Sequence, residues 1–267
     1  KAHAGFFSLI VLQMVCIIIG MHKSGTTLVA KTLHESGINM GSFDEIVSYD
    51  SGNQCERLET LELNIEMIGC NYKALGHNIL RVVKNPMSLG KDIRKKISKL
   101  IAELDQCHDN WGFKDPRSTL TYSVWSYFIP NHKMIAVVRH PAEIWHRYKT
   151  KNLIRSPVSY YLPFRALLAW YLYNKEILQH ILTREDYIVI DYGRFMLEQK
   201  EIDRLGSYVS NSLADCREHK LYRNRNKHDL VFTFCVGVLK QCFSCDVLRL
   251  YSSLYSLSLN SGLLGKG

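Results

Sequence analysis

Short apolar runs alternate along this chain with longer amphipathic stretches. The runs at residues 15–20 and 133–138 are rich in β-branched residues and predict buried parallel strands. Shorter runs at residues 111–114 and 187–191 predict two more strands. Strands that alternate with helices indicate an α/β protein. We therefore expect a P-loop-like, three-layer fold in which helices flank a central, mainly parallel sheet.

The amphipathic stretches predict helices at residues 26–36, 56–68, 89–106 and 160–182. The clearest is 89–106, in which apolar residues recur at helical spacing on one face and lysines and arginines lie mostly off that face. Its basic face is interpreted as solvated surface. A further helix is expected to begin at Pro141.

The boundaries of the domain follow from where these patterns begin and end. The apolar stretch of residues 4–20 ends in the first strand, and the part ahead of that strand is too short to span a bilayer. No stable membrane insertion is therefore expected. Residues 14–226 are interpreted as the working domain, residues 1–13 as an extension, and residues 227–267 as a helical C-terminal tail. The basic run at 217–228 fits a linker, a lid or a ligand clamp.

The chain carries 34 basic and 25 acidic residues, and its pI is about 9.1. This balance favours an anionic partner, such as an acidic glycan, a membrane surface, a nucleic acid or a phosphorylated cofactor. No recognised nucleic-acid-binding motif accompanies the charge, so no nucleic-acid partner is expected.

The eight cysteines are scattered, and several stand in apolar stretches. This usage favours reduced, buried thiols and a cytoplasmic location over a disulfide framework. Cys242 and Cys245 form the only close pair, and they lack two further ligands at the spacing of a zinc site.

The segment GMHKSGTT, residues 20–27, follows the first strand and opens the helix at 26–36. Its glycines have the spacing of a Walker loop, but Thr26 stands where that loop carries lysine. The N–H groups of residues 23–27 would still bind a phosphate at the helix N-terminus. Lys23 would approach that phosphate from the start of the loop. One charge and three hydroxyls together favour a phosphate site over a turn without a ligand.

Lys-Ser-Gly-Thr-Thr after a hydrophobic strand resembles the 5′-phosphosulfate loop of sulfotransferases, in particular the bacterial-type sulfotransferase domain. That family transfers the sulfuryl group of 3′-phosphoadenosine-5′-phosphosulfate (PAPS) to a hydroxyl or an amine. The resemblance implies that Lys23 supports the departing phosphate and that no metal is needed, because the loop grips a single 5′-phosphate. It assigns the 5′ side of PAPS to His22, Lys23, Ser24, Gly25, Thr26 and Thr27.

A second segment, MIAVVRHPAEIWHRY at residues 134–148, resembles the 3′-phosphate segment of the same family. There a strand ends in Arg-x-Pro, and a serine follows eight residues after the arginine. Arg139 takes the arginine position, and Arg147 replaces the serine. Because a guanidinium also binds phosphate bidentately, the resemblance implies that both arginines hold the 3′-phosphate.

A third segment, WGFKDPR at residues 111–117, resembles one that is common in bacterial-type sulfotransferases. Cytosolic members carry Lys-Thr-His there, with the histidine as catalytic base. Lys114 keeps the lysine, and Pro116 stands at the histidine position. Asp115 ends a strand at the carboxyl edge of the expected sheet, where ligands bind in α/β folds. The resemblance covers roughly residues 14–225.

Without the histidine, a carboxylate is the expected base. Some members use a glutamate from the region after the phosphate-loop helix, and Glu56 in NQCERLETLELN aligns with it. Asp115 and Glu45 are the next candidates, in that order. A carboxyl group in a dry site can have its pKa raised enough to accept an alcohol proton near neutrality.

Two other functions remain open from the sequence. A small-molecule kinase would need ATP and magnesium, yet Thr26 replaces its lysine and no acidic strand end suits the metal. A non-catalytic family member could bind anionic glycans or nucleotides without turnover. The preferred interpretation is a PAPS-dependent sulfotransferase that acts, without a metal, on a small-molecule or glycan acceptor.

Overall fold

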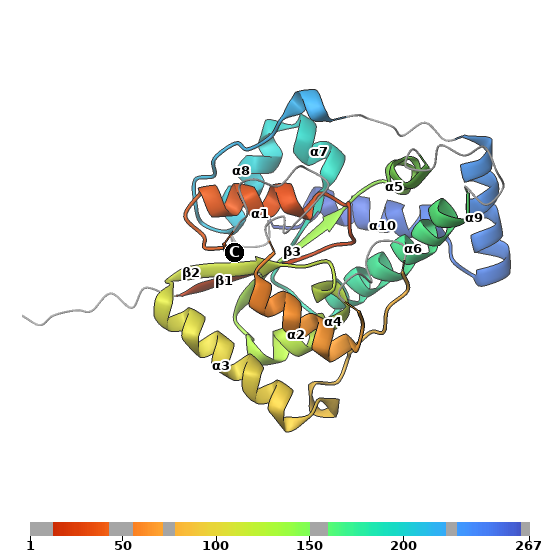
Figure 1. The fold of residues 1–267 in the computed structure, drawn as a ribbon. Coiled ribbons are helices and arrows are strands. Elements are labelled where there is room, and N and C mark those ends of the chain that lie inside the picture. The colour runs from red at the N-terminus through yellow and green to blue at the C-terminus, as the bar shows by residue number, and fades with distance from the viewer. Residues whose placement is uncertain (1–12, 43–55, 72–77, 150–159, 223–228, 263–267) are drawn as a thin grey trace, which may run out of the picture.

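The computed structural model describes residues 13–42, 56–71, 78–149, 160–222 and 229–262 (Figure 1). Within these ranges the chain forms four strands in the order β2-β1-β3-β4, and every neighbouring pair is parallel. The strands are β1 (Met14–Ile19), β2 (Asn110–Lys114), β3 (His132–Val138) and β4 (Tyr187–Asp191). The predicted α/β fold with a parallel sheet is confirmed.

Helices of the described residues connect these strands and follow them. They are α1 (Thr26–Glu35), α2 (Leu58–Ile68), α3 (Lys91–Cys107), α4 (Ser118–Phe128), α5 (Pro141–Lys149), α6 (Tyr161–Leu182), α7 (Tyr192–Leu197), α8 (Gln199–Tyr208), α9 (Leu230–Phe243) and α10 (Val247–Asn260), with short 3-10 turns η1 (Pro86–Ser88) and η3 (His219–Leu221).

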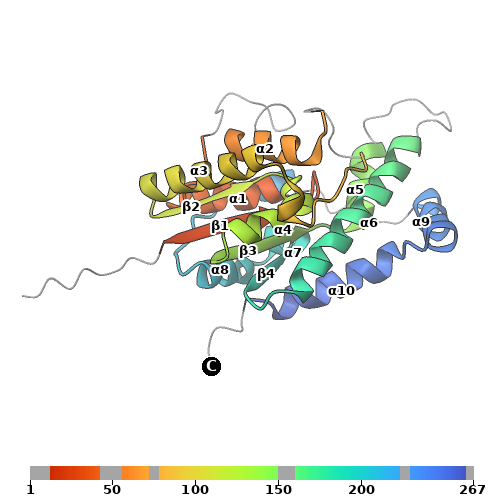
Figure 2. The same cartoon turned by 90° about the horizontal axis from the view of Figure 1, so that it is seen from below.

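The sheet separates two hydrophobic cores, as a three-layer fold requires. One core packs α1 and α8 against Ile18, Ile135 and Ile190. The other packs α2 to α6, α9 and α10 against the opposite face, to which Ile17 and Ala136 point. Figure 1 shows α1, α7 and α8 on one side of the sheet and α2, α3 and α4 on the other, and Figure 2 shows the same layers from below.

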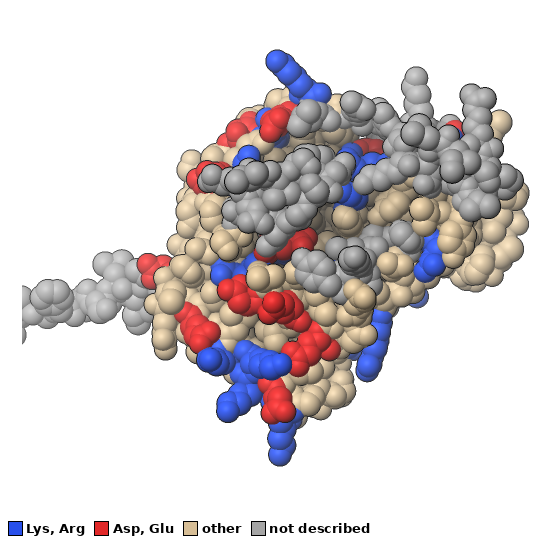
Figure 3. All heavy atoms as spheres, viewed as in Figure 1, with Lys and Arg blue, Asp and Glu red and all other residues tan. Residues whose placement is uncertain are grey.

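Helix α3 confirms the helix predicted at residues 89–106, although it begins two residues later than predicted. Gly90 precedes its first turn, and Ile97, Leu100 and Leu104 are its buried residues. Its lysines are exposed, and Lys96 pairs with a glutamate of α2 at 2.8 Å. Figure 3 shows acidic and basic side chains gathered over α2 and α3, so this face is a mixed, solvated surface rather than a basic patch.

The C-terminal helix α10 completes the core beside the edge strand β4. Ser261 accepts a hydrogen bond from the Val189 amide at 2.8 Å, and Arg204 donates to the Val189 carbonyl at 2.8 Å. These bonds satisfy backbone groups of β4 that no further strand in the described part of the chain pairs. Of the described residues beyond 226, those of α9 and α10 are helical, and both helices contribute to the core on one face of the sheet.

No single helix in the described ranges is long and apolar enough to cross a membrane. Helices α9 and α10 pass that test only as a pair, and they are bent by 99° with respect to each other.

Candidate active site

The loop after β1 is built on a tight turn. The Ser24 amide donates to the Met21 carbonyl at 3.1 Å, and the Ser24 hydroxyl donates to the same oxygen at 2.6 Å. Lys23 takes the third position of this turn with a φ of 69°. That left-handed conformation costs a non-glycine residue roughly 1–2 kcal/mol. The surrounding structure must therefore hold Lys23 in place.

Helix α1 begins directly after this turn. Gly25 caps the helix with a φ of 101°, and the amides of Leu28 and Val29 both donate to its carbonyl. Among the described residues, no protein atom accepts from the amides of Thr26 and Thr27. Together with the partial positive charge of the helix N-terminus, these donors form an anion site.

Both glycines of the loop are required by close approach. A Cβ on Gly25 would lie 2.0 Å from the Tyr192 ring, which follows β4. A Cβ on Gly20 would meet the Val137 carbonyl at 2.8 Å, and the Gly20 amide donates to the Thr119 hydroxyl at 2.9 Å. The loop thus packs against β3 and against residues that follow β2 and β4.

The end of β2 supplies a lysine–glutamate pair. Lys114 Nζ donates to Glu56 Oε1 at 2.9 Å, and their side chains are 2% and 17% exposed. Arg57 fixes the chain beside Glu56, because it donates to the Gly112 carbonyl at 3.2 Å and to the Asn39 side chain at 2.6 Å. The Glu56 carboxylate is therefore held at the carboxyl end of the strand, yet it reaches solvent.

Asp115, in contrast, is fully enclosed. Its carboxylate accepts from the Arg117 amide, from the Arg117 guanidinium at 3.0 Å and from Asn64 at 2.8 Å. Burial and the nearby Glu56 raise the pKa of Asp115 to about 6, although Arg117 and Asn64 oppose the shift. Asn64 also accepts from Thr121 at 2.6 Å. A carboxylate with these contacts supports the strand end and offers no open face to an acceptor.

Arg139 follows β3 and lies against the loop. Its guanidinium bonds Glu143 at 2.7 Å and donates to the Lys23 carbonyl at 3.2 Å. It also lies over the Tyr192 ring, 4.3 Å from the centroid. Arg147 stands in the last turn of α5, one turn beyond Glu143, and is half-buried.

The predicted site also includes His22, Ser24 and Glu45. His22 lies in the turn between Met21 and Ser24 and is half-buried, and Ser24 is buried. Glu45 lies outside the described residues.

Several residues that build this edge of the sheet were not predicted from the sequence. They are Arg57, Asn64, Arg117, Thr119, Glu143 and Tyr192. Glu143 was within reach of the sequence, because its spacing of four from Arg139 predicts an ion pair along a helix.

Comparison with known proteins rests on the fold. No protein-family model matches the sequence, and no curated protein matches it. The solved sulfotransferase domain of the Synechococcus PCC 7002 olefin synthase aligns with a TM-score of 0.52 at 13% identity, over 90% of this chain and 94% of that one. The chain has the fold of a sulfotransferase domain. A sulfotransferase domain from the curacin biosynthetic pathway aligns with a TM-score of 0.48 at 14% identity, over 91% and 98% of the two chains.

The sulfotransferase fold brings the three segments singled out in the sequence to one edge. The loop follows β1, the segment at 111–117 ends β2, and the segment at 134–148 ends β3. Because β1 lies between β2 and β3, the loop is flanked by the other two segments. Segments far apart in the sequence thus converge at the carboxyl ends of adjacent strands.

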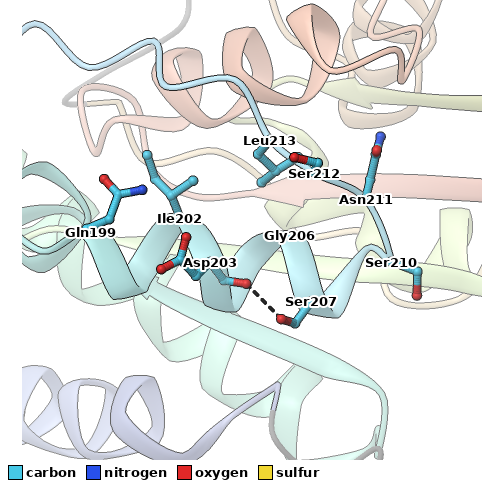
Figure 4. A pocket seen from close by; sticks show the side chains of 9 residues that line it. All are labelled: Gln199, Ile202, Asp203, Gly206, Ser207, Ser210, Asn211, Ser212 and Leu213. Carbon is cyan, nitrogen blue, oxygen red and sulfur yellow. Dashed lines mark hydrogen bonds between the residues drawn. The ribbon is translucent and has the colours of Figure 1, made fainter.

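The hollow in Figure 4 has a different character. It has a volume of about 390 Å³ and lies between α8 and the chain that follows it. Hydroxyl, amide and apolar groups line it, and its single charged side chain is Asp203. It therefore offers no cation to a phosphate or sulfate. In the described ranges, no three His, Cys, Asp or Glu side chains are grouped so that they could hold a metal ion.

Proposed function

We propose that this protein is a sulfotransferase that moves the sulfuryl group of PAPS to a hydroxyl or amine of a small-molecule or glycan acceptor. The observation that carries the proposal is the pairing of two features at one edge of the sheet. One is an anion site at the start of α1, with Lys23 in its turn. The other is the Lys114–Glu56 pair at the end of the adjacent strand.

The donor would lie across the ends of β1 and β3. Amides at the start of α1 would hold the 5′-phosphate, together with the hydroxyls of Thr26 and Thr27. The Ser24 hydroxyl instead closes the turn, because it donates to the Met21 carbonyl. The 3′-phosphate would lie toward Arg147, in the last turn of α5. These groups would bind the nucleotide without a metal ion.

The chain's own residues would then assist an in-line transfer. The Glu56 carboxylate takes the proton of the acceptor while the acceptor oxygen or nitrogen forms its bond to sulfur. The bond between sulfur and the bridging oxygen breaks, and that oxygen leaves with the 5′-phosphate of 3′-phosphoadenosine-5′-phosphate. Lys23 and Lys114 neutralise the charge that grows on the leaving phosphate and the transferring group. Alignment of the two reactants supplies much of the remaining rate.

The kinase alternative lacks support at the same edge. Asp115 at the end of β2 is enclosed by Arg117 and Asn64. Asp191 at the end of β4 accepts from Tyr251 at 2.9 Å and from the Arg194 amide. Neither acid is open to magnesium, and Thr26 is no substitute for the lysine of an ATP-binding loop.

The test is calorimetric titration of 3′-phosphoadenosine-5′-phosphate without magnesium. Wild type, Lys23→Ala and Lys31→Ala are compared. Lys31 is an exposed residue of α1 and loses the same charge away from the loop. We expect micromolar binding that requires the 3′-phosphate, weakens in Lys23→Ala and is unchanged in Lys31→Ala.

Three results would contradict the proposal in different ways. Binding of ATP only, and only with magnesium, would favour the kinase. No nucleotide binding would remove the donor altogether. Tight binding followed by no release of product from PAPS, across hydroxyl and amine acceptors, would indicate a non-catalytic nucleotide-binding protein.

A further inference from the structure

The guanidinium of Arg139 is already occupied by protein groups. Its Nε and Nη2 both bond Glu143 Oε2 at 2.7 Å, and its Nη1 donates to the Lys23 carbonyl at 3.2 Å. Three of the five donors that any guanidinium carries are thus engaged. The Tyr192 ring covers one of its faces, and the side chain is only 6% exposed.

The buried Glu143 carboxylate also neutralises the charge of Arg139. Glu143 is 2% exposed, and its second oxygen accepts from the Tyr222 hydroxyl at 3.3 Å. Burial raises the pKa of Glu143, and the Arg139 guanidinium partly offsets that shift. A buried arginine that is paired in this way offers a phosphate little net charge.

The contacts of Arg139 converge on the two unusual backbone positions of the phosphate loop. Its guanidinium donates a hydrogen bond to the carbonyl of Lys23, whose φ is 69°. It also lies on the Tyr192 ring, against which Gly25 packs with a φ of 101°. Lys23 needs support from outside the loop, because left-handed backbone is strained for lysine. Gly25 packs so closely on the Tyr192 ring that a Cβ there would collide with it.

We infer that Arg139 is a positioning residue that holds the 5′-phosphate loop, through the Lys23 carbonyl and the Tyr192 ring, rather than the residue that selects the 3′-phosphate. This inference rests on the proposed function. It reassigns one of the two arginines that the resemblance places at the 3′-phosphate. Glu143 contributes to the same positioning, because its carboxylate orients the Arg139 guanidinium toward the loop.

Two nucleotides separate the two roles. Adenosine 5′-phosphate and 3′-phosphoadenosine-5′-phosphate share the 5′-phosphate and differ only at the 3′ position. In Arg139→Gln we expect both affinities to fall by the same factor, about tenfold, since a charged hydrogen bond to the loop is lost. The ratio of the two affinities should remain that of wild type. A loss confined to 3′-phosphoadenosine-5′-phosphate, or no loss for either nucleotide, would overturn the inference.

Glu143→Gln provides a second variant in which the two roles predict opposite results. It keeps Arg139 and its charge, and it weakens the anchor that directs the guanidinium to the loop. A positioning role predicts weaker binding of both nucleotides at an unchanged ratio. An arginine that selects the 3′-phosphate would instead be released from its carboxylate, and the ratio would rise in favour of 3′-phosphoadenosine-5′-phosphate.

Amide hydrogen exchange in the protein without nucleotide tests the inference independently of the donor. We expect faster exchange at residues 23–27 in both variants, and wild-type exchange along β3. Unchanged exchange in the loop would overturn the positioning role even if PAPS is the donor. Faster exchange in the loop, with no nucleotide bound by wild type, would remove the proposed function and leave Arg139 as a brace of the loop.

Discussion

The two edges of the sheet both carry charged residues, and they differ in how those residues are held. The amino edge has a hollow of about 760 Å³, lined by residues that begin β1, β2 and β3. Its lysine and acid, Lys133 and Asp186, pair at 3.0 Å with side chains 32% and 50% exposed. At the carboxyl edge, Lys114 and Arg139 are only 2% and 6% exposed, and their partners Glu56 and Glu143 are 17% and 2% exposed.

This difference teaches that the volume of a hollow is a poor guide to chemistry. An exposed ion pair is worth about 0–1 kcal/mol, because water competes with it. Charges that are shielded from water interact more strongly, and helix amides without partners add oriented donors. Among the described residues, the carboxyl edge combines the two, since α1 begins there. Variants at matched positions of the two edges test whether this difference determines function.

The largest effect is expected at Glu56. Glu56→Gln retains an oxygen that can accept from Lys114, so the side chain should stay in place while its basicity is lost. We expect kcat for sulfuryl transfer to fall by about 10²- to 10⁴-fold, the range of general base catalysis. Release of 3′-phosphoadenosine-5′-phosphate from PAPS measures it, with an acceptor identified by screening. Affinity for the nucleotide should be unchanged.

Asp186→Asn is the matched change at the amino edge, because it also neutralises a carboxylate paired with a lysine. It should leave kcat unchanged. Equal losses in both variants would mean that the two edges do not differ in function, and an active Glu56→Gln would remove Glu56 as the base.

Gly25→Ala should have the next largest effect. The added Cβ would lie 2.0 Å from the Tyr192 ring at a φ of 101°, so the loop must move and its amides must turn. We expect affinity for 3′-phosphoadenosine-5′-phosphate to fall by about 100-fold, since several charged hydrogen bonds would be lost together. Titration calorimetry measures this change.

Gly37→Ala separates the collision from the cost of the backbone conformation. Gly37 has a φ of 90°, and a Cβ there would meet no atom within 4 Å. This variant should lose about 1 kcal/mol of unfolding free energy and bind the nucleotide as wild type does. A normal affinity in Gly25→Ala would show that the start of α1 does not bind the nucleotide.

The parts of the site that local patterns encode were predictable from the sequence. Apolar runs gave all four strands, because a buried parallel strand needs continuous hydrophobic residues. The loop at residues 20–27 was visible because its glycines and hydroxyls are consecutive. Glu56 and Lys114 were named separately, from resemblance, and their pairing at 2.9 Å is a property of the fold.

The parts that tertiary packing creates were not predictable. Arg57 reaches Gly112, 55 residues away, and no local pattern marks that contact. Tyr192 stands under Gly25 only because β4 ends beside the loop. Helix α4 was not predicted, since its sequence STLTYSVWSYF is rich in β-branched and aromatic residues with modest helix propensity. Burial between neighbouring elements decides its conformation.

The last prediction concerns stability at the amino edge, where His132 begins β3. Its ring bonds the Tyr122 hydroxyl at 2.7 Å and contacts the Ile129 carbonyl. Burial, and then the nearby Arg184, lower its pKa from 6.5 to about 4. Between these values the unfolded chain binds a proton that the folded protein does not bind. Stability contributed by this group is therefore complete above pH 6.5 and falls as the pH is lowered.

From pH 7 to pH 5 this group alone should remove about 2 kcal/mol of unfolding free energy. Denaturant unfolding of wild type and His132→Asn at both pH values isolates it, because other titrating groups contribute equally to both proteins. Asp115 acts in the opposite direction, since its raised pKa favours the folded state as the pH falls below about 6. Equal pH dependence in the two proteins would show that His132 takes up its proton while folded. The amino edge would then be as open to water as its hollow suggests, and enclosure would distinguish the two edges more sharply.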